Sequence, residues 1–187
     1  GARRGRRALP GPAGREVPVL ALGPDGRWVF ARDARGQVGV WDVARERPRM
    51  TIDAHDDSTF DLTFSPDGTT LAVVDGVDGV SLWSVADGSL LWKRQDNFRA
   101  NFRVAFHPAG NRLAVASNDY TVRIHDVATG EPLLTFRPSN WPMFCAAFSP
   151  DGAQLAIGGA DAAITLLDAR PAADVNRLGG PGPTETK

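Results

Sequence analysis

The chain has 187 residues, of which 42% are hydrophobic and 23% are charged, and its formal net charge is −1. This composition is typical of a soluble globular protein with a hydrophobic core. No apolar run approaches the roughly 20 residues that span a bilayer, and the single cysteine, Cys145, excludes an intrachain disulfide. We therefore expect a cytoplasmic protein without membrane contact.

The first 16 residues differ from the rest in charge. They hold five arginines and one acidic residue, so they carry a formal charge of +4 and leave about −5 on the remainder. A basic arm of this kind can contact nucleic acid or an acidic partner. Glycine and proline interrupt the segment, however, and we favour a flexible leader that binds no nucleic acid.

A repeat of 42 residues dominates the chain after this leader. Pro-Asp-Gly occurs at 24–26, 66–68 and 150–152, and Pro-Ala-Gly occurs at 108–110. A second series with the same period consists of Trp41-Asp42, Trp83-Ser84, His125-Asp126 and Leu167-Asp168. The two series keep their spacing without one insertion or deletion, so we expect four copies of a single structural unit.

Each repeat predicts four short strands. Apolar residues alternate along the segment before each Pro-Asp-Gly turn, which indicates a half-buried strand followed by a tight hairpin. First strands are expected at 20–22, 62–64, 104–106 and 146–148, second strands at 71–74, 113–116 and 155–157, third strands at 38–43, 80–85, 122–127 and 164–169, and fourth strands at 48–52, 90–94 and 132–136. The outer strand of the last repeat, at 174–178, has only two apolar residues.

The predicted fold is all-β, with four four-stranded antiparallel units. The expected boundaries are a basic leader at 1–16, units at about 17–52, 53–94, 95–136 and 137–178, and a flexible tail at 179–187.

Three segments carry a family resemblance. The hairpins at 64–72 and 148–156, which both read Phe-Ser-Pro-Asp-Gly and end in Leu-Ala, resemble the first hairpin of a WD40 repeat. The segment at 121–130 resembles the third strand of that repeat and the turn after it. Residues 17–178 are therefore similar to a WD40-type β-propeller in a degenerate form. The string at 166–171, Leu-Leu-Asp-Ala-Arg-Pro, resembles the end of repeats in bacterial multidomain proteins. The resemblance implies that each repeat is one blade and that the propeller holds protein partners.

The repeats depart from the family pattern in their buried polar residues. In the family, a His, a Ser or Thr, an Asp and the Trp of a blade form a hydrogen-bonded set. Here the Ser/Thr position is apolar in every repeat. The repeat residues that still match are Trp41, Asp42, Trp83, Asp119, Asp126, Asp161 and Asp168, together with His55. We expect the blades to depend on apolar packing, and we expect His125, which replaces a repeat Trp, to be packed.

The number of repeats raises the question of ring closure. WD40 propellers usually close with six to eight blades, whereas this chain has four repeats. Open ends leave strand edges and sheet faces uncovered. Three alternatives follow: the chain is an excerpt of a longer array, two copies pair into an eight-bladed ring, or four blades form a compact ring.

The resemblance places the candidate binding site on one rim, where the loop before each first strand meets the turn between the second and third strands. Aromatic residues and arginine on such a rim are typical anchors of protein interfaces. The candidate residues are His55, Asp56, Asp57, Phe60, Arg99, Phe102, Tyr120, Trp141 and Phe144. Trp141, beside Pro142, is the preferred single anchor, and the alternative is that it packs under its loop.

Phe60, Phe102 and Phe144 occupy one equivalent position in consecutive repeats. In relatives that position can line the mouth of the central channel and grip a partner's side chain. Here the three residues share strand parity with apolar residues two positions later, so strand core is the favoured interpretation.

No chemical motif accompanies the repeats. The acidic residues near Asp56 lack the ligand spacing of a calcium cage, and the three histidines lack a second ligand at metal-binding spacing. The sequence has no nucleophile elbow, phosphate-binding loop or zinc motif. We expect a non-catalytic scaffold without cofactor or metal. The alternatives are a regulatory or sensory segment of a larger bacterial protein such as a Ser/Thr kinase, and a lactonase-like hydrolytic propeller.

Overall fold

The computed structural model shows a chain whose strands form four antiparallel sheets. It describes residue 9 and residues 19–32, 38–52, 59–75, 79–95 and 101–168. Every element in these ranges is a strand, and the same ranges contain no helix that could span a membrane. Apart from residue 9, the basic segment 1–16 lies outside the described residues, as do the expected outer strand at 174–178 and the tail.

Each sheet corresponds to one blade, and its strands follow one another in chain order. Blade 1 contains β1 (Val19–Leu22), β2 (Trp28–Arg32), β3 (Val38–Asp42) and β4 (Arg47–Ile52). Blade 2 contains β5 (Thr59–Phe64), β6 (Thr70–Asp75), β7 (Val80–Ser84) and β8 (Leu90–Arg94). Blade 3 contains β9 (Asn101–Phe106), β10 (Arg112–Ser117), β11 (Val122–Asp126) and β12 (Pro132–Phe136). Blade 4 has three described strands, β13 (Met143–Phe148), β14 (Gln154–Gly159) and β15 (Ile164–Asp168). The predicted all-β architecture of four antiparallel units is confirmed.

Short-range hydrogen bonds close the hairpin between the first two strands of a blade. Between β5 and β6, Gly68 has a φ of 71°, a left-handed conformation that favours glycine. The Asp67 carboxylate accepts hydrogen bonds from the Ser65 hydroxyl and the Thr69 amide. These bonds join residues that are close in the sequence, so the turn can be recognised from the Pro-Asp-Gly series alone. The positions of the strands on either side of the turn could therefore be predicted from the sequence.

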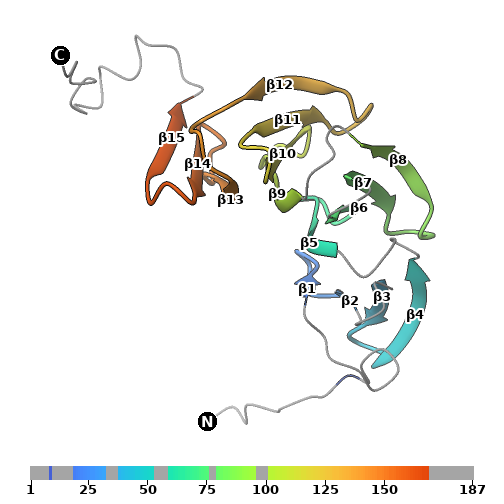
Figure 1. The fold of residues 1–187 in the computed structure, drawn as a ribbon. Helices are drawn as coiled ribbons and strands as arrows, with labels where there is room; N and C mark the ends of the chain where they lie inside the picture. Colours follow the sequence, from blue (N-terminus) through green and yellow to red (C-terminus); the bar gives the residue numbers. More distant parts are fainter. Residues whose placement is uncertain are drawn as a thin grey trace, which may run out of the picture.

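The four blades lie along an open arc (Figure 1). The first strands β1, β5, β9 and β13 follow one another along its concave side, and consecutive members are in contact. The outer strands β4, β8 and β12 lie on the convex side. Blades 1 and 4 stand at the two ends of the arc and do not meet, so the alternative of a compact four-bladed ring is wrong.

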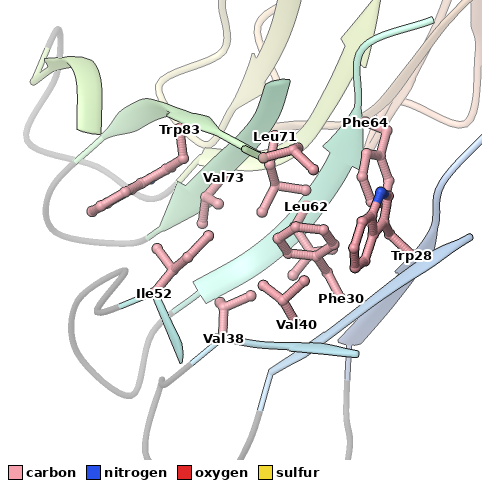
Figure 2. Packing of buried hydrophobic residues seen from close by; sticks show 11 residues of the cluster. Trp28, Phe30, Val38, Val40, Ile52, Leu62, Phe64, Leu71, Val73 and Trp83 are labelled. Carbon is pink, nitrogen blue, oxygen red and sulfur yellow. The ribbon is translucent and has the colours of Figure 1, made fainter. Parts of the chain in front are cut away.

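The hydrophobic core lies between blades. Figure 2 shows the core shared by blades 1 and 2, in which Phe30 meets Phe64 edge to face with ring centroids 4.7 Å apart. Residues of opposite parity on one strand enter different cores. Leu71 on β6 joins this core, whereas Ala72 joins the core between blades 2 and 3. Each inner blade is therefore apolar on both faces, as expected for stacked repeats.

One buried indole is satisfied within its own strand rather than by the family's four-residue set. The Trp83 Nε1 donates to the Ser81 hydroxyl at 2.8 Å, two residues earlier on β7. The equivalent of Ser81 in blade 1 is Gly39, and the Trp41 Nε1 has no hydrogen-bond partner in the described part of the chain. A Cβ atom at Gly39 would come within 2.1 Å of the Trp41 ring. The ring can occupy its place only because residue 39 is glycine.

His125 is fully buried, as predicted for a residue that replaces a repeat Trp. Its ring stacks on Trp92 with centroids 6.4 Å apart, and its Nδ1 lies 3.1 Å from the Gly130 carbonyl oxygen. The Trp92 Nε1 donates to the Val127 carbonyl. These contacts join the outer strand of blade 2 to the turn after β11 in blade 3.

Candidate interaction rim

One end of blades 3 and 4 gathers several aromatic residues. The turn between β10 and β11, the connection from β12 to β13, and the starts of β9 and β13 all lie at this end, because neighbouring strands of a blade are antiparallel. We use the name rim patch for five described residues of this end: Phe102, Tyr120, Arg137, Trp141 and Phe144.

Phe102 and Phe144 lie at β-bulges. In β9, Asn101 and Arg103 pair with consecutive residues of β10, which makes Phe102 the extra residue, and Phe144 is extra in β13 in the same way. A bulge interrupts the strict alternation of a strand. Phe144 is 47% exposed, and Phe102 is partly buried. The strand-core interpretation assumed unbroken parity, so it is wrong for Phe144 and holds only in part for Phe102.

The two phenylalanine rings meet across the junction of blades 3 and 4. Their centroids lie 5.4 Å apart and their planes are inclined at 73°, which is an edge-to-face pair. Residues from two blades thus form one aromatic surface. The register of β5 shows the same bulge at Phe60, whose side chain lies outside the described part of the structure.

Tyr120 occupies the turn between β10 and β11 with a φ of 73°, an uncommon conformation for a residue other than glycine. The Arg137 guanidinium lies 4.9 Å from the centre of the Tyr120 ring and donates through Nε to the Ser139 carbonyl. This cation–π contact ties the turn to the connection between β12 and β13.

Trp141 presents its indole to solvent, and the residue is 57% exposed. Its backbone amide donates to the Ser139 hydroxyl, and the carbonyl of the next residue, Pro142, accepts from the Ala160 amide. Hydrogen bonds therefore hold the backbone on both sides of the exposed ring. The alternative that Trp141 packs under its loop is wrong.

Asp119 stabilises the turn that carries Tyr120. Its carboxylate accepts a hydrogen bond from the Arg123 guanidinium at 2.6 Å and further bonds from the hydroxyl and amide of Thr121. Partial burial alone raises the pKa of Asp119, but the hydrogen bonds from Arg123 and Thr121 outweigh it and lower that pKa to about 2. At neutral pH a charged network thus holds the turn. The corresponding Asp161 in blade 4 accepts a hydrogen bond from the Ala163 amide.

A link between blades 2 and 3 was not predicted from the sequence. Asp61 on β5 is buried, and its carboxylate accepts hydrogen bonds from the Val104 amide at 3.0 Å and the Arg103 guanidinium at 3.3 Å. Burial raises the pKa of Asp61, while the bonds from Val104 and Arg103 act in the opposite direction. Asp61 and Arg103 hold equivalent repeat positions with opposite charges, and this was the signal that could have revealed the pair.

The structure does not bring the remaining predicted residues into the rim patch. His55, Asp56, Asp57 and Arg99 lie outside the described residues. Asp42 pairs with Arg45 at 2.8 Å, and Asp126 accepts from the Thr129 amide, so both stabilise turns that follow third strands. Asp168 is the last residue of β15. Within the described ranges, no three His, Cys, Asp or Glu side chains are grouped so that they could hold a metal ion.

Comparison with known proteins identifies the repeat. A family model described as "WD domain, G-beta repeat" matches residues 46–84, 102–126 and 130–168, which make up more than half of the chain. The last of these ranges includes Arg137, Trp141 and Phe144 of the rim patch. A search of the curated proteins finds no match.

Proposed function

We propose that this chain, which belongs to the WD40-repeat family, is a non-catalytic scaffold that binds protein partners through the rim patch of blades 3 and 4. WD40 repeats are generally an interaction fold, and this supports a binding role at a general level. One observation carries the specific form of the proposal. The exposed Trp141 indole stands on a backbone that hydrogen bonds hold on both sides.

The rim patch has the chemistry of an interface anchor. Trp, Tyr and Arg are enriched among the residues that dominate binding energy at protein interfaces. Side chains that are already held in place lose less conformational entropy when a partner binds. Phe102 and Phe144 pack against each other. Arg137 lies over Tyr120, and the Asp119 network supports the turn beneath.

The patch also limits the chemistry of its partner. Trp141 and Phe144 offer exposed aromatic surface, so we expect a partner that contributes an apolar or aromatic segment. The exposed Arg137 suits an acidic group at the edge of that segment. The proposal includes a cytoplasmic location for the complex, and the single cysteine in 187 residues supports it.

The test is capture of partners from an extract of the cells that make this protein. The wild-type chain, Trp141→Ala and two control variants are immobilised at equal density, and the bound proteins are quantified by mass spectrometry. Leu91→Ala removes a half-exposed hydrophobic side chain from β8, and Arg27→Ala removes an arginine from the turn between β1 and β2. We expect one set of proteins to be lost from Trp141→Ala and retained by both controls.

Phe144→Ala provides the second variant of the rim patch. We expect it to lose the same proteins as Trp141→Ala, because both rings are exposed at the same end of blade 4. Circular dichroism melts establish that each variant is folded. The proposal is wrong if both rim variants retain every partner, or if Leu91→Ala loses the same proteins.

A further inference from the structure

The two end blades carry faces that no described blade covers. Within the arc, each inner blade packs one face on the blade before it and the other on the blade after it. We name the face toward the following blade the leading face, and the face toward the preceding blade the trailing face. Blade 4 has no described blade after its leading face, and blade 1 has none before its trailing face (Figure 1).

The 42-residue register identifies the leading face of blade 4. Val38, Val80 and Val122 begin the third strands of blades 1 to 3, and each is at most 2% exposed in the core shared with the next blade. The equivalent residue in blade 4 is Ile164, which is 80% exposed. Leu166 on the same face is 61% exposed, although its counterparts in the other blades are buried.

The same register identifies the trailing face of blade 1. Leu62, Val104 and Ala146 lie on the first strands of blades 2 to 4 and are at most 7% exposed, because the preceding blade covers them. The equivalent residue in blade 1 is Leu20, which is 63% exposed. The outer part of this face, at Trp41, is buried. The open part is therefore its inner edge, along β1.

The three described junctions show how a leading face meets a trailing face. In each of them the first residue of the third strand shares a core with the same first-strand residue of the next blade. The pairs are Val38 with Leu62, Val80 with Val104, and Val122 with Ala146. Continuing the series by one blade brings Ile164 against the residue that is equivalent to Leu62, and on this chain that residue is Leu20.

We propose that the leading face of blade 4 binds the trailing face of blade 1 in a second copy of this chain, and that two such junctions close a ring of two copies. Blade 4 offers a hollow, and blade 1 offers side chains of a kind that could enter it. Beside Ile164, the small residues Cys145, Ala147, Ala156 and Gly158 line a shallow apolar hollow that can receive an aliphatic side chain. Leu20 and Leu22 supply such side chains from blade 1. Reciprocal pairing covers the exposed faces of both described end blades, whereas a single junction leaves one of these faces exposed in each copy.

The solution mass of the full 187-residue chain tests the proposal. Light scattering after size-exclusion chromatography should give twice the chain mass of 20.0 kDa, with dissociation on dilution. A single chain at every concentration up to several hundred micromolar would overturn the proposal. A series of species larger than two copies would overturn the closed ring, since open head-to-tail association continues without limit.

Variants at each end test which faces meet. Ile164→Glu and Leu20→Glu should each be a single chain, with self-association weakened at least about 100-fold, because both place a charge in an apolar junction. An equimolar mixture keeps one intact junction, so it should recover a two-copy species that neither variant forms alone. Leu91→Glu, on the outer strand β8, should remain a two-copy species. The contradicting result is that Leu20→Glu still forms a two-copy species by itself while Ile164→Glu does not. Blade 4 would then bind blade 4 of the other copy, without blade 1, and the proposal would be wrong.

A disulfide tests the register of the junction. Asp61 of blade 2 contacts the backbone of Val104 in blade 3. The residue of blade 4 that is equivalent to Asp61 is Cys145, and the residue of blade 1 that is equivalent to Val104 is Leu20. The proposed junction therefore places Cys145 of one copy beside Leu20 of the other. Leu20→Cys should therefore form an interchain disulfide with Cys145 under mild oxidation. Leu133→Cys, half-exposed on β12, should not. Equal cross-linking of both variants, or cross-linking of Leu20→Cys when Cys145→Ser is also present, would overturn the register.

Discussion

The Phe144 ring packs edge to face on the Phe102 ring, with the centroids 5.4 Å apart. Both residues are the extra residue of a β-bulge, one on β13 and the other on β9. The bulges take the rings out of the strand alternation and bring them together at the rim. The aromatic surface of the rim patch therefore depends on the junction of blades 3 and 4 and not on a single loop.

The ring pair should contribute to stability as a unit. We predict a coupling energy of about 0.5–1.5 kcal/mol between Phe102→Ala and Phe144→Ala in a double-mutant cycle measured by urea unfolding. The control is the same cycle for Phe102→Ala and Phe30→Ala, because Phe30 lies in the junction of blades 1 and 2. The stability losses of these two substitutions should be additive. Additive losses for Phe102 and Phe144 would show that the rings do not interact in solution.

Asp119 should make stability depend on pH in the acid range. Its pKa is about 2 in the folded chain, below the ordinary value of 3.8, so the ionised carboxylate stabilises the fold above pH 3.8. That contribution, about 2 kcal/mol, falls away as the pH drops from 3.8 toward 2. Asp119→Asn should thus be less stable than wild type at pH 7, with a difference that shrinks through this range. An equal difference at all pH values would contradict the lowered pKa.

At Asp61 the loss of the charge should not destabilise the fold, because burial disfavours the ionised carboxylate and raises its pKa. Asp61→Asn keeps an oxygen that can accept from the Val104 amide and removes the buried charge, so its unfolding free energy at pH 7 should equal or exceed that of wild type. Asp61→Leu leaves the Val104 amide without its acceptor and should cost about 1–3 kcal/mol. Urea unfolding of the two variants checks this, and equal losses would show that the charge itself stabilises the junction.

Substitutions at one repeat position should destabilise blades 1 and 2 for different physical reasons. Ser81→Ala removes the acceptor of the Trp83 Nε1 and should lower the free energy of unfolding by about 1 kcal/mol. Gly39→Ser supplies the same hydroxyl beside Trp41, but its Cβ atom collides with the ring, so it should also destabilise the chain, by about 1–3 kcal/mol. Thermal unfolding compares the two variants. Stabilisation by Gly39→Ser would show that the Trp41 ring has room to move.

The fold was predictable because its signals are local. The Ser65–Thr69 turn closes through bonds that span a few residues, and alternation along a short strand shows which face is apolar. The burial of His125 followed from its place in the repeat series.

The geometry of the candidate site was less predictable because it depends on pairing between strands. The bulge that exposes Phe144 arises from the register of β13 on β14, which residue parity alone does not contain. The bond from the Val104 amide to Asp61 joins a backbone group to a side chain in another repeat. The exposure of Trp141 likewise depends on how the connection from β12 to β13 is held.

The most direct measurement is the affinity of a captured partner for the wild-type chain and for Trp141→Ala, obtained by titration calorimetry. If the rim patch is the binding surface, the loss of the indole should weaken binding at least about 30-fold, which corresponds to about 2 kcal/mol. Leu91→Ala should bind within about twofold of wild type. Equal affinities of Trp141→Ala and wild type would contradict the assignment of binding to the rim of blades 3 and 4.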